Sequence, residues 1–113
     1  MKRYCLALDL KNDLALIAEY EQWHQQVSPE IEKSIRDAGI SNMEIYRIGT
    51  RMFMILEADE TFTFERKASM DESNPKVQEW EKLMWKFQQP LPDARPGEKW
   101  VLMKKIYGLK DAE

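Results

Sequence analysis

Two side chains in the stretch "EYEQWH", Tyr20 and His24, have the types and spacing needed for proton transfer near neutral pH. They are four residues apart, and His24 is the only histidine in the chain. On a helix this spacing puts both on one face, with Cβ atoms about 6 Å apart. Imidazole gives and accepts protons near pH 7, and the phenol adds a hydroxyl donor. The alternative, a half-buried structural histidine beside a packing tyrosine, stays open.

Three further aromatic residues are candidates for a ligand pocket. Tyr46 shares one face of a predicted strand with Glu44 and Ile48, where it either meets the Tyr20 and His24 pair or belongs to the core. Trp80 and Trp85 are five residues apart, too far round a helix for one narrow stripe, so at least one is predicted to point toward a pocket. Indole rings suit the apolar face of a sugar, although most helical tryptophans are core or interface residues.

The rest of the sequence removes several kinds of chemistry. It has no Gly-rich phosphate loop, no G-x-S-x-G elbow and no Cys-His nucleophile pattern. One cysteine, Cys5, and one histidine cannot make a structural zinc site, so we expect neither a metal nor a cofactor. Proton transfer on a small neutral ligand remains.

Composition predicts one globular domain over residues 1–113. Hydrophobic residues make up 43% and charged residues 33%, and the net charge of -3 is scattered along the chain, which argues against a nucleic-acid partner. The early charges of "MKRYCLALDLKND" leave no room for a signal peptide, and no run approaches the roughly 20 apolar residues of a membrane span. We therefore expect a cytoplasmic protein without a membrane partner.

Periodicity predicts the elements that hold these residues. Alternation over 3–10 indicates a strand, and helical spacing runs from an N-cap at Asp13 to Ala38, with a bend or restart at Ser28-Pro29. Segments 42–48 and 51–58 flank Gly49-Thr50 as a hairpin. A second helical region, about 59–88, is broken near 71–75, a loop covers 88–99, and a fourth strand is expected over 100–107.

This order, β-α-β-β-α-β, predicts an α+β fold of the ferredoxin-like kind, an antiparallel sheet with helices on one face. The other face would then be open, and a partner subunit or a ligand pocket should cover it. A homodimer is the commonest arrangement of this type.

The stretches "YCLALDL", "EYEQWHQQVSPEIEKSIRDAGI", "MEIYRIGTRMFMILE" and "NPKVQEWEKLMW" together resemble the L-rhamnose mutarotase family and its relatives that act on L-fucose. The resemblance implies a dimeric ferredoxin-like α+β barrel, with His24 as proton donor and Tyr20, Tyr46 and Trp80 as sugar contacts. Where bacterial members often carry a second Trp, this chain has Glu81, and Trp85 follows four residues later. Both are candidate sugar contacts. The stretches "SIRDAGI", "MEIYR" and "LMWKFQQ" resemble the branch that acts on L-fucose, which implies L-fucose as substrate, with L-rhamnose close behind.

Interconversion of anomers moves two protons, one from the anomeric hydroxyl and one to the ring oxygen, so it needs an acid and a base but no cofactor. The candidates for the base are four carboxylates, Glu19, Glu21, Glu44 and Glu81. Two rival functions fit the same fold plan: a dimeric monooxygenase acting on a quinol or haem, and a non-catalytic sugar-sensing dimer.

Overall fold

The first strand forms as its alternating pattern predicts. A computed structural model describes residues 2–110 of the chain, beginning with β1 (Lys2–Leu10). Leu6, Leu8 and Leu10 lie on its buried side, whereas Arg3 and Asp9 lie on the other side and are less buried. Because side chains alternate along a strand, the sequence pattern itself directs one face of β1 into the core.

The predicted helical stretch from Asp13 to Ala38 is two helices, α1 (Leu14–Gln25) and α2 (Pro29–Asp37). Asp13 caps α1 by accepting the backbone N–H groups of Ala15 and Leu16, at 3.0 and 3.1 Å. Ser28 caps α2, and Pro29 occupies its first turn. The expected restart at Ser28-Pro29 is confirmed, since proline lacks the N–H that a continuous helix would need.

The hairpin and the second helical region follow their local signals. β2 (Ile40–Ile48) and β3 (Arg51–Ala58) flank Gly49, whose φ of 57° suits a tight turn. The second region divides into α3 (Phe64–Glu72) and α4 (Pro75–Trp85), with Asn74 as the cap of α4. The expected helical start near residue 59 is wrong: Asp59 accepts the N–H of Thr61 at 2.8 Å in a turn, and helix begins only after the cap Thr63.

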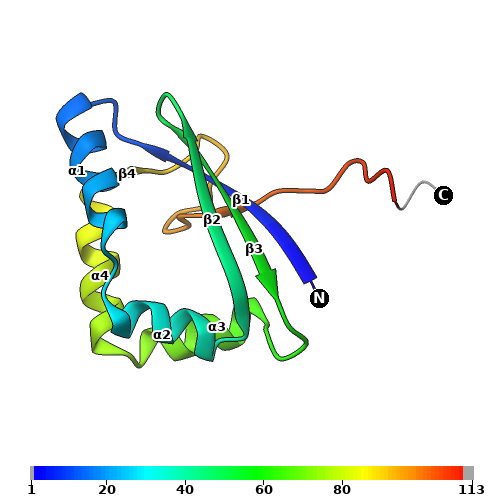
Figure 1. Cartoon of the computed structure of the whole chain (residues 1–113). Coiled ribbons are helices and arrows are strands. Elements are labelled where there is room, and N and C mark those ends of the chain that lie inside the picture. Colours follow the sequence, from blue (N-terminus) through cyan, green and yellow to red (C-terminus); the bar gives the residue numbers. More distant parts are fainter. Residues whose placement is uncertain (1, 111–113) are drawn as a thin grey trace.

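The last expected strand is much shorter than predicted. Only β5 (Val101–Leu102) forms within 100–107, while β4 (Gln88–Gln89) forms inside the expected loop. β5 pairs with β1 at two positions, and the Met103 N–H then donates to the Cys5 carbonyl at 2.8 Å. Beyond Met103 the chain leaves the sheet (Figure 1), and residues 104–110 belong to no strand.

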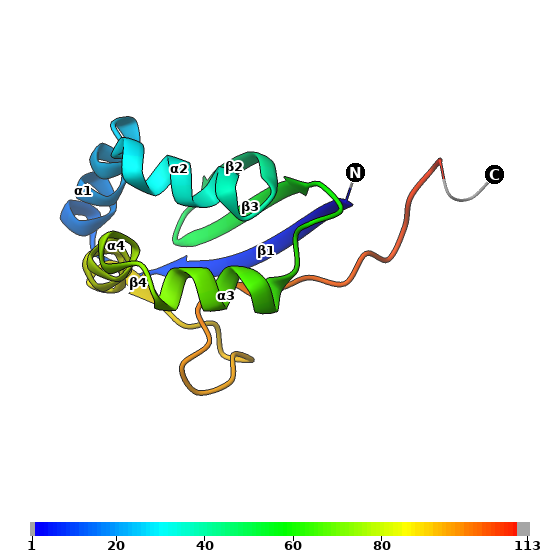
Figure 2. The same ribbon diagram turned by 90° about the horizontal axis from the view of Figure 1, so that it is seen from below.

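The sheet is antiparallel, with the strand order β2-β3-β1-β4 and β5 beside β1. The helices cover one side of it, and the C-terminal segment leaves on the other (Figures 1 and 2). Two clusters of apolar side chains fill the space between sheet and helices, one around Leu8 and Phe87 and one around Leu6 and Phe62. The fold is therefore the expected ferredoxin-like α+β fold.

None of the helices within residues 2–110 is long and apolar enough to cross a bilayer. The same part of the chain contains no group of three or more His, Cys, Asp or Glu side chains placed to hold a metal ion.

Candidate active site

The inward face of α1 carries the two residues that the sequence selects. Ile17 and Tyr20 are buried on this face, and His24 follows one turn later, partly buried. The Tyr20 and His24 rings lie 4.4 Å apart between centroids, with 36° between their planes. The predicted pair therefore forms on one helix face.

Trp80 of α4 completes a cluster of three rings. Its centroid lies 5.5 Å from that of His24, at an interplanar angle of 66°. Phe87 packs edge-on against Tyr20 from the other side, at 5.9 Å. Helices far apart in the sequence thus bring together three of the predicted site residues, His24, Tyr20 and Trp80.

A backbone hydrogen bond sets the orientation of the imidazole. His24 Nδ1 lies 2.9 Å from the carbonyl oxygen of Tyr20. A carbonyl can only accept, so Nδ1 carries the proton in this bond and Nε2 is the nitrogen left to exchange protons. Burial lowers the pKa of His24 below its usual value of 6.5, and the bond to Tyr20 offsets part of that effect.

Gln88 is a buried polar residue beside Tyr20 that the sequence analysis did not select. Its Nε2 donates to the Tyr20 hydroxyl at 3.3 Å, while its Oε1 has no partner within the described residues. Burial raises the pKa of Tyr20, and the bond from Gln88 opposes that shift. The only sequence signal for Gln88 was its position directly after Phe87. Gln88 is also the first residue of the expected loop, 88–99, so it was not expected to be buried.

A cavity of about 400 Å³ opens beside His24, between the end of α1, α2 and β2. This volume lies within the range of small-molecule sites. Its apolar walls include Val27, Ile35 and Met43, and its polar lining is Glu32, Arg36, Ser41 and Asn42. An imidazole that borders a mixed apolar and polar cavity is the arrangement that acid–base chemistry on a small hydroxylated ligand requires.

The structure does not bring Tyr46 to this cavity within the protomer. Tyr46 lies opposite Phe53 and is 55% exposed, whereas its neighbour Ile45 points to the helix side and lines the cavity. Adjacent strand residues face opposite sides of a sheet, so Tyr46 lies on the open side.

Glu81 and Trp85 also lie away from His24. Lys99 is 3.4 Å from the Glu81 carboxylate and 4.9 Å from the centroid of the Trp85 ring. Both residues therefore contact the segment that leads into β5, and neither lines the cavity beside His24.

None of the four carboxylates considered as a base lines this cavity. Glu21 pairs with Arg47 at 3.3 Å, Glu81 contacts Lys99, and Glu44 lies on the open side of the sheet. The carboxylate that does line the cavity is Glu32, near the start of α2. Its sequence signal was weak, because acidic residues in a first helical turn are common for electrostatic reasons alone.

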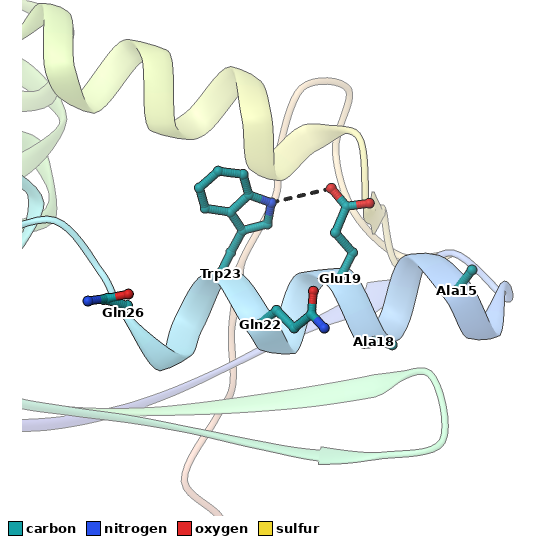
Figure 3. A pocket seen from close by; sticks show the side chains of 6 residues that line it. All are labelled: Ala15, Ala18, Glu19, Gln22, Trp23 and Gln26. Atoms are coloured by element: carbon teal, nitrogen blue, oxygen red, sulfur yellow. Dashed lines mark hydrogen bonds between the residues drawn. The ribbon is translucent and has the colours of Figure 1, made fainter.

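Glu19, the remaining candidate, belongs to a larger and more open hollow on the outer side of α1. Trp23 Nε1 donates to Glu19 Oε2 at 3.4 Å, and every residue lining the hollow comes from α1 or, in the case of Gln26, from its C-cap (Figure 3). Because a single helix face cannot enclose a ligand, this hollow is not the candidate site.

Comparison with known proteins identifies the relatives of this chain. The family model for L-rhamnose mutarotase matches residues 3–109. An L-fucose mutarotase of Xanthomonas campestris is 45% identical over 114 residues, covering 99% of this chain and 91% of that protein.

Solved structures share the fold. The L-rhamnose mutarotase of Formosa agariphila superposes with a TM-score of 0.72 at 17% identity, covering 96% of this chain and 99% of that one. A dimeric ferredoxin-like protein from an uncultured marine organism gives 0.54 at 15% identity, covering 82% and 95%. On the family model and the sequence identity, this chain belongs to the L-rhamnose mutarotase family and is an isomerase of the mutarotase type.

Proposed function

We propose that the protein interconverts the α and β anomers of a 6-deoxy-L-hexose, L-fucose in the first place and L-rhamnose in the second. The observation that carries this proposal is the cluster of His24, Tyr20 and Trp80 beside a cavity of about 400 Å³. The L-fucose mutarotase that is 45% identical to this chain supports the preference for L-fucose.

The reaction needs two proton transfers and consumes no proton overall. The C1–O5 bond breaks as the ring oxygen gains a proton, and the anomeric hydroxyl loses one as the aldehyde forms. Rotation about C1–C2 and closure on the other face complete the exchange. His24, protonated at Nε2, gives the proton to the ring oxygen, because Nδ1 is engaged by the Tyr20 carbonyl.

Glu32 is the base of this proposal. It is the carboxylate that lines the same cavity as His24, and it would take the proton from the anomeric hydroxyl, directly or through one water. Glu32→Gln keeps the size of the side chain and removes its basicity, so exchange should slow by about 10² or more. The Glu19→Gln variant, on the outer side of α1, is the matched control and should exchange at the wild-type rate. Equal rates in the two variants would eliminate Glu32.

Tyr20 and Trp80 contact the His24 ring but do not themselves line the cavity, and as predicted sugar contacts they would offer a hydroxyl contact and an apolar contact. Tyr46, Glu81 and Trp85 stay predictions as sugar contacts. L-Fucose and L-rhamnose differ at C2 and C4, and a site separates them by hydrogen bonds to those hydroxyls. If Glu81 takes part, Glu81→Trp should change the ratio of the two exchange rates.

Exchange NMR of the anomeric protons tests the activity. L-Fucose and L-rhamnose are measured separately, with and without catalytic amounts of protein, and we expect faster exchange with L-fucose. Acceleration of L-rhamnose alone would correct the substrate, and acceleration of neither would refute the proposal.

We further propose that the protein works as a homodimer in the cytoplasm. The open side of the sheet supports the dimer. The location is a prediction that cell fractionation would check.

A further inference from the structure

Gln88 of β4 combines burial in the core with a hydrogen-bonding group that packing does not need. Among residues 2–110 it is the only residue with an amide or charged side chain in the buried core, at 5% exposure. Its Nε2 donates to the Tyr20 hydroxyl at 3.3 Å, and no group in the same part of the chain donates to its buried Oε1. An apolar side chain of similar length would fill the space without an acceptor to satisfy, so the amide indicates a role beyond packing.

Backbone hydrogen bonds fix the position of Gln88 relative to the first strand. β4 pairs antiparallel with β1, where Gln88 lies opposite Leu10. One residue earlier, the carbonyl of Phe87 accepts the N–H of Lys11 at 2.8 Å. Because the sheet holds its backbone, Gln88 can serve as a fixed support for the side chain that it contacts.

Tyr20 is held against β4 by two contacts of different kinds. Phe87 packs edge-on against the Tyr20 ring, with 5.9 Å between centroids, and Gln88 donates to the hydroxyl at the tip of that ring. An edge-on ring contact tolerates sliding, whereas a hydrogen bond is limited to a narrow range of distance and angle. The Gln88 amide therefore fixes the tip of the Tyr20 side chain.

The Tyr20 ring in turn supports His24. The two ring centroids are 4.4 Å apart, and the Trp80 ring lies 5.5 Å from the imidazole. His24 Nδ1 is 2.9 Å from the Tyr20 carbonyl oxygen, which keeps Nε2 as the nitrogen that exchanges protons. Rotation of the imidazole out of this orientation would have to displace the neighbouring rings, so a fixed Tyr20 ring stabilises it.

We propose that Gln88 is a positioning residue for the proton transfer at His24. Its amide fixes the Tyr20 phenol, and the Tyr20 ring then holds the imidazole with Nε2 available. The inference rests on the function proposed above and adds a residue that lies outside the lining of the cavity.

Steady-state exchange kinetics of Gln88→Met test this role. Methionine keeps the approximate length of the side chain and removes the amide. Since Gln88 does not line the cavity, its loss should leave sugar binding intact and misplace the acid, and a displacement of about 1 Å can slow a reaction by about 10². We expect kcat for anomer exchange to fall by about 10-fold to 100-fold, with KM changed by less than about twofold.

Gln89→Met is the matched control for this variant. Gln89 is the next residue of β4 and is exposed, so the same substitution there should leave the exchange rate at the wild-type value.

Tyr20→Phe breaks the same contact from the other side. It removes the hydroxyl that Gln88 holds and keeps the ring, so kcat should fall in this variant as well. Adding Gln88→Met to Tyr20→Phe should lower kcat no further, because both changes remove one hydrogen bond. Full additivity of the two effects on ln kcat would overturn the proposal.

Proton NMR of the imidazole separates positioning from a loss of stability. His24 is the only histidine in the chain, so its ring protons give one set of signals, which the nearby Tyr20 and Trp80 rings shift. At about pH 8, where the imidazole is neutral, these signals should move in folded Gln88→Met and stay in place in Gln89→Met. A purely structural loss lowers the midpoint of unfolding and leaves the signals of the folded protein unchanged.

Folded Gln88→Met with either wild-type His24 signals or a wild-type kcat would overturn the inference. If that variant does not fold, Tyr20→Phe carries the same two measurements with the same outcomes. A wild type that does not exchange anomers would refute the proposed function, whereas the His24 signals would still decide whether Gln88 holds the imidazole.

Discussion

The catalytic efficiency, kcat/KM, should fall as the pH rises through the pKa of His24, and this is the sharpest test of the proposed chemistry. The group that titrates is Nε2, because Nδ1 donates to the Tyr20 carbonyl at 2.9 Å in both charge states. Burial lowers the pKa of His24 from 6.5. If the active form has a protonated His24 and an ionised base, kcat/KM should fall as the pH rises through a value below 6.5.

The size of the fall follows from the titration curve. Two pH units above its pKa an imidazole is protonated in about 1% of molecules, so kcat/KM at about pH 8.5 should be about a hundredth, or less, of its acid plateau. The assay is exchange NMR of anomeric protons, with the spontaneous rate subtracted at every pH because hydroxide also catalyses the reaction.

His24→Asn supplies the comparison for this experiment. Asparagine retains an amide that can donate to the Tyr20 carbonyl but cannot transfer protons near neutral pH, so exchange should slow by about 10² to 10⁴ and the pH dependence should disappear. Gln22→Asn, on the outer face of α1, controls for changing this helix. A wild-type kcat/KM that is flat or rises between about pH 6 and 8.5 would refute the assignment of His24 as acid.

Three further predictions concern stability. Since His24 has a lowered pKa in the folded protein, the unfolded chain binds more protons between that pKa and about 6.5. The free energy of unfolding of the wild type, relative to that of His24→Asn, should therefore increase as the pH rises through this window and stay constant above about pH 6.5. Urea titrations of both proteins at several pH values measure this difference, and a difference that falls with rising pH would contradict the prediction. Tyr20→Phe should lower the free energy of unfolding by about 1 to 3 kcal/mol, because the buried Gln88 amide loses the Tyr20 hydroxyl, and adding Gln88→Leu should recover much of the loss. Simple additivity in this double-mutant cycle, measured at one protein concentration, would show that the hydrogen bond carries no coupling. Gly39→Ala should cost roughly 1 to 3 kcal/mol or more, because φ is 97° and the new Cβ would meet Asp59 Oδ1 and Thr61 Oγ1 at 2.6 Å; a melting temperature equal to that of the wild type would contradict this reading.

Local signals were enough for most of the elements. The caps at Asp13 and Ser28 start helices where the sequence predicts them, and the cap at Asn74 lies within the predicted break at 71–75, because a side-chain oxygen satisfies N–H groups that the helix itself leaves free. Gly39 and Gly49 adopt the positive φ angles that a stop and a tight turn require. The alternation in β1 and the pairing of Tyr20 with His24 also follow from spacing alone, since the helical and strand repeats are fixed by backbone geometry.

The order of the elements predicted the fold, and the resemblance in four stretches predicted the family. What neither supplied was which face of the hairpin turns inward. Glu44, Tyr46 and Ile48 share a face, as their spacing predicts, but that face is the open one, and Met43 and Ile45 line the cavity instead. Spacing fixes only that neighbours alternate, whereas register against β3 and burial against the helices decide which set is inside.

The sequence by itself therefore determined most of the elements, their order and the aromatic pair on α1. Only the tertiary structure brought Trp80 to His24, selected Glu32 among many carboxylates and Gln88 from an expected loop, and ended β5 after Leu102. The physical reason is the same in each case. Caps, turns and periodicity depend on residues a few positions apart, whereas a cavity lining, a buried amide or the length of a strand depends on partners that the fold brings from distant parts of the chain.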